Sequence, residues 1–150
     1  MPSPARLLLA AFLATAALAA RAEIIDVDNT ELARLMASGV PVIDVRTAGE
    51  WEETGIVPGS RLLTYFDDNG KADPPAWLAR AQAYARAGQP VAVICRSGNR
   101  TKVVSRYLSQ EAGYAKVYNV KGGIKAWIAE GRPTAPAAQA LAACRADKTC

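Results

Sequence analysis

The sequence predicts an α/β domain whose five-stranded, mainly parallel sheet lies between two layers of helices. Short runs rich in Val and Ile alternate five times with segments of helical periodicity, and short connections join them. The 150 residues suffice for one packed core but not for two ordinary domains. In sheets of this kind, ligands bind beyond the carboxyl ends of the strands, so functional side chains are expected there.

The helices and strands are predicted from the hydrophobic pattern and from the residues that start or end them. Strands are predicted where short apolar, β-branched runs occur, at residues 23–27, 42–45, 61–65, 91–94 and 116–120. Helices are predicted where apolar residues recur at helical spacing, at residues 31–37, 47–54, 74–87, 101–111 and 124–130. Asp28 with Glu31, and Thr47 with Glu50, have the capping-box spacing that starts a helix.

Residues 1–22 have the pattern of a secretory signal peptide. Arg6 precedes a run of about 13 apolar residues, and small residues stand at Ala20 and Ala22, where a signal peptidase reads the chain. The run is shorter than the ~20 residues that span a bilayer. We expect cleavage, a periplasmic or secreted protein and no stable membrane anchor, with an uncleaved anchor as the alternative.

Charge and composition limit the classes of partner and cofactor that the chain is expected to bind. Without Arg6 and Arg21 the chain has 16 basic and 14 acidic residues, a net charge of about +2. It contains no basic run, so nucleic acid is not an expected partner. It has no histidine and no Cys-x-x-Cys pair, which argues against a metal site, and no motif for another cofactor stands out. The sequence leaves the oligomeric state open.

The three cysteines divide into a pair and a single thiol. Cys144 and Cys150 close a short loop, and an oxidising compartment favours a disulfide between them. Cys95 is then the odd thiol. The surrounding tail, residues 134–150, is rich in Ala and Pro, and we expect a linker or weak helix without a partner face.

Cys95 begins a polar loop between a predicted strand and a predicted helix. The helix presents an apolar stripe, whereas the loop offers no apolar side chain beyond the thiol. A buried structural cysteine at a strand end is the alternative, but the loop is too polar and too basic for it. We therefore predict that Cys95 is a nucleophile. The stripe consists of Val103, Val104, Tyr107 and Leu108.

The loop supplies the means to activate a thiolate without a base. A helix that starts near Thr101 directs free N–H groups toward the sulfur. Arg96 and Arg100 add two positive charges, and Gly98 permits the positive φ that a nest of N–H groups requires. Because the chain has no histidine, activation has to be electrostatic. Ser97 and Asn99 complete the polar lining.

The segment Cys-Arg-Ser-Gly-Asn-Arg-Thr at 95–101 resembles the active-site loop of the rhodanese (sulfurtransferase) family. Asp-Val-Arg at 44–46, Glu50 with the connector 55–60, and the stretch 118–124 resemble three further motifs of the family, in order. The resemblance covers about residues 23–133, with the tail 134–150 outside it. Ile56 departs from the pattern because the family usually has histidine there; we expect an effect on packing near the connector.

The resemblance implies a rhodanese-like three-layer fold and a persulfide carried on Cys95. Sulfur would pass from a small-molecule donor such as thiosulfate to cyanide or a thiol acceptor, as in exported single-domain members. The substrate-binding residues would be the rest of the loop, Arg96, Ser97, Gly98, Asn99, Arg100 and Thr101. Asp44 and Arg46 would support them.

Roles outside the loop stay less defined. We expect Asp44 to pair with a loop arginine, with a solvated acid at a strand end as the alternative. Arg46 either binds the anionic donor or makes a surface ion pair. Trp77 and Trp127 are expected in the core.

Three other functions compete with sulfur transfer. A phosphatase or arsenate reductase of related fold uses Cys-x₅-Arg, but here Thr101 occupies the arginine position and Arg100 comes one residue early. A non-catalytic rhodanese-like binding module often lacks the cysteine that this chain retains. A redox relay from Cys144 and Cys150 to Cys95 would rest on the tail pair alone.

Overall fold

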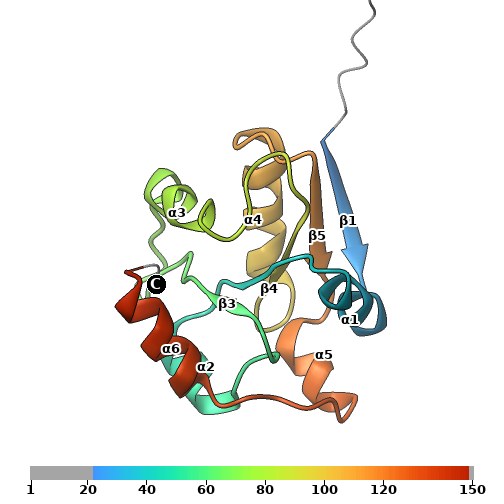
Figure 1. The fold of residues 1–150 in the computed structure, drawn as a ribbon, viewed down its shortest axis with the longest axis vertical. Coiled ribbons are helices and arrows are strands. Elements are labelled where there is room, and N and C mark those ends of the chain that lie inside the picture. Colours follow the sequence, from blue (N-terminus) through green and yellow to red (C-terminus); the bar gives the residue numbers. More distant parts are fainter. Residues whose placement is uncertain (1–21, 149–150) are drawn as a thin grey trace, which may run out of the picture.

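The computed structural model describes residues 22–148, and it contains a five-stranded parallel sheet (Figure 1). The spatial order is β1-β5-β4-β2-β3, and every neighbouring pair is parallel. The predicted fold class is therefore confirmed. The strands are β1 (Glu23–Val27), β2 (Val42–Asp44), β3 (Arg61–Leu62), β4 (Val91–Ile94) and β5 (Lys116–Val120).

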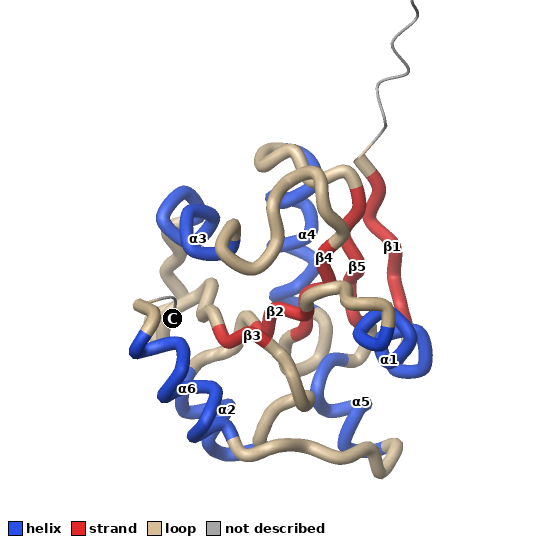
Figure 2. The backbone as a smooth tube through the Cα atoms, viewed as in Figure 1, coloured by secondary structure: helices blue, strands red, loops and turns tan. Residues whose placement is uncertain are grey.

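Helices cover both faces of the sheet, and Figure 2 shows the strands enclosed between them. In the fully buried β4, Val91 and Val93 face a cluster that includes Trp77, while Ala92 and Ile94 face one that includes Trp127. This alternation produces the three layers, and both tryptophans are core residues as predicted. The helices are α1 (Asn29–Ala37), α2 (Ala48–Thr54), α3 (Pro74–Ala81), α4 (Asn99–Gln110), α5 (Gly123–Ala129) and α6 (Ala137–Ala146).

The two predicted helix caps are confirmed. Asp28 caps α1 by accepting from the Glu31 N–H at 2.8 Å, and Thr47 and Glu50 form the capping box of α2. Two elements end well before the predicted residue. α3 ends at Ala81, after which the chain continues in tight turns, and β3 has only two residues because the sheet ladder to β2 ends there.

α4 starts two residues earlier than predicted and buries a different stripe. Val103 is 46% exposed, so its assignment to the apolar stripe is wrong. Thr101 and Ser105 are buried instead, beside Val104 and Leu108. The buried face of the helix therefore includes small polar side chains, and one of them, Thr101, lies 3.7 Å from the Cys95 sulfur.

The C-terminal segment is a docked helix, so the expectation that it has no partner face is wrong. Leu141 and Cys144 of α6 are buried in a cluster with Trp51, Ile56 and Leu62. Two backbone hydrogen bonds of 2.9 Å join Ile56 to Ala135 just before the helix.

α6 explains how an apolar residue is accommodated at Ile56. Ile56 is 2% exposed and packs against α6. This helix belongs to the tail, which lies outside the segment that resembles the family. The predicted disulfide remains a prediction, because Cys150 lies outside the described residues. The signal peptide likewise falls almost wholly on residues that are not described. Within residues 22–148, no helix has the length and apolar character to cross a membrane.

Candidate active site

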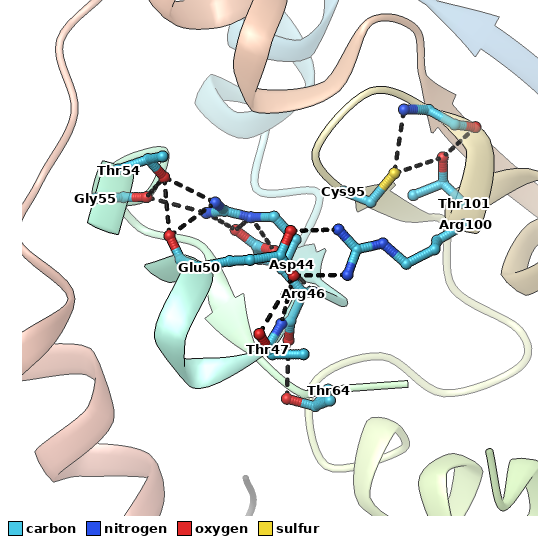
Figure 3. A network of polar contacts seen from close by, with 11 residues as sticks. Asp44, Arg46, Thr47, Glu50, Thr54, Gly55, Thr64, Cys95, Arg100 and Thr101 are labelled. Carbon is cyan, nitrogen blue, oxygen red and sulfur yellow. Dashed lines mark hydrogen bonds and ion pairs between the residues drawn. The ribbon is translucent and has the colours of Figure 1, made fainter. Parts of the chain in front are cut away.

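Chemistry-bearing residues meet at one edge of the sheet, as parallel topology requires. Asp44 ends β2 and Cys95 follows β4, and these two strands are direct neighbours. Figure 3 shows Cys95 and Arg100 on one side of this edge, facing residues that belong to β2 and α2. The site is thus assembled from two segments well separated in the chain, residues 44–55 and residues 95–101.

The thiol of Cys95 lies inside the loop that follows it. Cys95 is 1% exposed, and its Sγ accepts a hydrogen bond from the Gly98 N–H at 3.1 Å. Gly98 has φ of 94°, the left-handed conformation predicted for this position. Thr101 Oγ1 is 3.7 Å from Sγ and donates to the Gly98 carbonyl at 3.1 Å. The loop therefore curls around the sulfur, and α4 begins directly behind it.

α5 holds the outer side of this loop. The carbonyls of Cys95 and Arg96 accept hydrogen bonds from the N–H groups of Ile124 (2.9 Å) and Lys125 (3.1 Å). A peptide group whose carbonyl is held outward directs its N–H to the opposite side. α5 thus fixes the loop in the orientation in which the Gly98 N–H reaches the sulfur.

Gly123 makes this contact possible. It has φ of +58°, and a Cβ there would lie 2.3 Å from the Cys95 carbonyl oxygen and 2.5 Å from Arg96. No other residue type fits without moving the loop. Gly123 is therefore a tight packing surface between α5 and the Cys95 loop.

Arg100 pairs with Glu50 of α2. Its two terminal nitrogens donate to the two carboxylate oxygens at 2.7 and 2.5 Å, a bidentate geometry. These bonds are the main reason that the pKa of Glu50 is lowered from 4.5 to about 2, and they raise the pKa of Arg100. This ion pair links α4, which carries Arg100, to α2, which carries Glu50.

Asp44 pairs with Arg46 and not with a loop arginine, which corrects the expected pairing. Arg46 Nε and Nη2 donate to the Asp44 carboxylate at 2.8–3.1 Å, and both side chains are fully buried. Arg46 also donates to Thr54 Oγ1 and to the carbonyls of Glu50 and Gly55. The surface ion pair considered for Arg46 is therefore wrong as well: the guanidinium is buried and fastens α2 to the end of β2.

The predicted loop residues divide into two groups. Gly98 and Thr101 are buried beside the sulfur, while Arg96, Ser97 and Asn99 are exposed around it. Sequence reasoning missed the positioning role of Glu50, although its place in the capping box and in a family motif marked it. No group of three or more metal-ligating side chains gathers among residues 22–148.

The model of the rhodanese-like domain matches residues 28–130. The chain belongs to the rhodanese-like family. It is 30% identical over 116 residues to thiosulfate sulfurtransferase 18 of Arabidopsis thaliana, a match covering 74% of this chain and 83% of that protein. A crystal structure of a rhodanese-related protein from Thermoplasma volcanium is 27% identical, with a TM-score of 0.56, and the match covers 74% of this chain and 97% of that one.

Longer relatives contain a similar domain. The adenylyltransferase and sulfurtransferase uba4 of Aspergillus fumigatus is 31% identical over 110 residues, which is 63% of this chain. The match spans only 22% of that protein. The rhodanese-like family membership and these sulfurtransferase relatives support a transferase that moves sulfur, in general terms.

Proposed function

We propose that this rhodanese-like protein is a thiosulfate-type sulfurtransferase that carries sulfane sulfur as a persulfide on Cys95. In the first half-reaction the Cys95 thiolate attacks the outer sulfur of thiosulfate. A new S–S bond forms, the S–S bond of thiosulfate breaks, and sulfite leaves with the electron pair. The product is Cys95–S–S⁻.

The second half-reaction returns the enzyme to its starting state. Cyanide or a thiol acceptor attacks the terminal sulfur of the persulfide, and the Cys95 thiolate leaves. With cyanide the product is thiocyanate. Neither half-reaction transfers a proton when thiolate and cyanide react as anions, which suits a site without a Cys–His pair.

The observation that carries the proposal is the environment of the Cys95 sulfur. Its Sγ accepts the Gly98 N–H at 3.1 Å, inside a loop whose outward carbonyls are bonded to α5. Fixed N–H donors stabilise a negatively charged sulfur at the start of the reaction and again in the persulfide.

The test is a sulfur-transfer assay combined with intact mass. Wild type should form thiocyanate from thiosulfate and cyanide, and after thiosulfate alone it should gain the mass of one sulfur atom. Cys95→Ala should do neither while keeping its fold, judged by circular dichroism. Wild type without added mass and without thiocyanate would contradict the proposal.

Phosphatase activity serves as the contrast. Arg100 is paired with Glu50 and stands one residue too early for the Cys-x₅-Arg arrangement. We expect no phosphate release from p-nitrophenyl phosphate. Release of phosphate without formation of thiocyanate would favour the phosphatase over the sulfurtransferase.

Export and the tail disulfide belong to the same proposal. The apolar run in residues 1–22 supports cleavage near Ala22, and Cys144 and Cys150 support a disulfide in an oxidising compartment. N-terminal sequencing of the protein from a periplasmic fraction should begin at residue 23. A chain that retains residue 1 and stays in the cytoplasm would contradict export.

A further inference from the structure

A small cleft opens beside the Cys95 loop, between α2 and α5. Its volume is about 140 Å³, and Arg96 forms part of its wall directly after the reactive cysteine in the chain. Both helices lie at the carboxyl edge of the sheet (Figure 1). The cleft is lined by Arg46, Glu50, Glu53, Thr54, Arg96, Ile124, Lys125 and Ile128.

The charges of this cleft are only partly neutralised. Arg46 is held by Asp44, and Glu50 is held by Arg100. Arg96 and Lys125 are exposed, and in the part of the chain that the structure describes neither of them forms an ion pair. Glu53 is the one acidic residue of the lining without a partner there, so the cleft retains an excess of one positive charge.

Backbone contacts anchor the two cations, Arg96 and Lys125, to the Cys95 loop. The Lys125 N–H donates a hydrogen bond to the Arg96 carbonyl at 3.1 Å, so the backbones of the two residues are in direct contact. Arg96 in turn follows Cys95. Their side chains therefore start from adjacent points at the rim of the loop, one from each wall.

The volume limits the ligand. A water molecule takes up about 30 Å³ of the liquid, so a cleft of 140 Å³ corresponds to roughly four or five waters. This suits an anion of about five heavy atoms, such as thiosulfate. Ile124 and the 43%-exposed Ile128 give the remaining wall an apolar character.

We propose that this cleft is the entry site for a small oxyanion and that Lys125 is a specificity-determining residue for it, acting with Arg96. The proposal rests on the proposed function in naming a sulfur-donating oxyanion as the ligand. It assigns Lys125 to recruitment of the donor and not to the chemistry at sulfur. Glu53 opposes the recruitment, so removing its charge should strengthen it.

The test compares two alkylating reagents on Cys95. Iodoacetate is an anion and iodoacetamide is neutral, and the same Cys95 thiolate attacks both and displaces iodide. Their rate ratio therefore cancels any change in the thiolate fraction and reports how strongly the entrance favours an anion. Alkylation is followed by mass spectrometry of the peptide that contains Cys95.

Three variants define the expected outcome. Lys125→Glu should lower the iodoacetate-to-iodoacetamide ratio roughly fivefold, and Glu53→Gln should raise it about twofold, with both effects fading in 1 M salt. Lys116→Glu makes the same charge reversal at the opposite edge of the sheet, where β5 begins, and should leave the ratio unchanged. In parallel, KM for thiosulfate should rise in Lys125→Glu while kcat stays near that of wild type.

The outcomes separate this inference from the proposed function. Equal ratios in Lys125→Glu and Lys116→Glu would overturn the anion site even if wild type transfers sulfur. The expected shifts in ratio without thiocyanate formation would support the anion site and reject the sulfurtransferase. No alkylation of wild type by either reagent would also overturn the inference, because the cleft would then not lead to the thiol.

Discussion

Removing the charge of Glu50 tests whether α2 positions the active-site loop. In Glu50→Gln the capping box can persist, because glutamine serves at the third helical position, but the bidentate ion pair with Arg100 is lost. We expect lower stability at neutral pH and weaker sulfur transfer, since Arg100 is no longer held in front of Cys95. The control is Glu52→Gln, which removes an exposed acid from the same helix.

The magnitude follows from the pKa of Glu50. A fall from 4.5 to about 2 corresponds to about 3 kcal/mol if nothing screens the pair. The side chains of Arg100 and Glu50 are 25% and 23% exposed, so water and salt weaken the interaction. We therefore expect Glu50→Gln to cost about 1–2 kcal/mol at pH 7.

The pH dependence has a definite sign. Because the pKa of Glu50 is lower in the folded state, its contribution is complete above pH 4.5 and is lost as the pH falls through about 2. Urea unfolding followed by tryptophan fluorescence should show wild type and variant converging, with more than half of the difference gone near pH 3. A difference that stays constant from pH 7 to pH 3, or that equals that of Glu52→Gln, would refute the reasoning.

Three further predictions concern the frame of the site. Gly123→Ala should abolish sulfur transfer and lower the melting temperature, because its Cβ would overlap the Cys95 carbonyl. The control is Gly113→Ala, at a glycine that also has a positive φ but has open space around it. Its smaller fall in melting temperature measures the cost of the backbone conformation alone. Arg46→Met should reduce the free energy of unfolding by about 3–5 kcal/mol in urea, because it leaves a buried carboxylate unpaired, and a loss below about 1 kcal/mol would contradict this. Leu141→Ala should cost about 2–3 kcal/mol by the same assay, and an unchanged midpoint would mean that α6 contributes nothing to the folded state.

Local sequence signals predicted much of the fold. The helix starts at Asp28 and Thr47 were predicted correctly because a cap depends on residues three positions apart. β1 and β5 were placed correctly because each is a short apolar run between clear breaks. The tail was misjudged: its apolar stripe is mostly alanine, and the partner face that buries it, around Trp51 and Ile56, comes from another part of the chain.

The sequence by itself determined the reactive element: a thiol between a buried strand and a helix, followed by a basic, glycine-containing loop. Only the tertiary structure decided which residues contact that loop and fix its position. Arg100 forms an ion pair with Glu50, fifty positions away in the chain. The carbonyls of Cys95 and Arg96 accept hydrogen bonds from the start of α5. Conformation within a loop depends on neighbours in the chain, whereas ion pairs and close backbone contacts depend on how the sheet brings distant segments together.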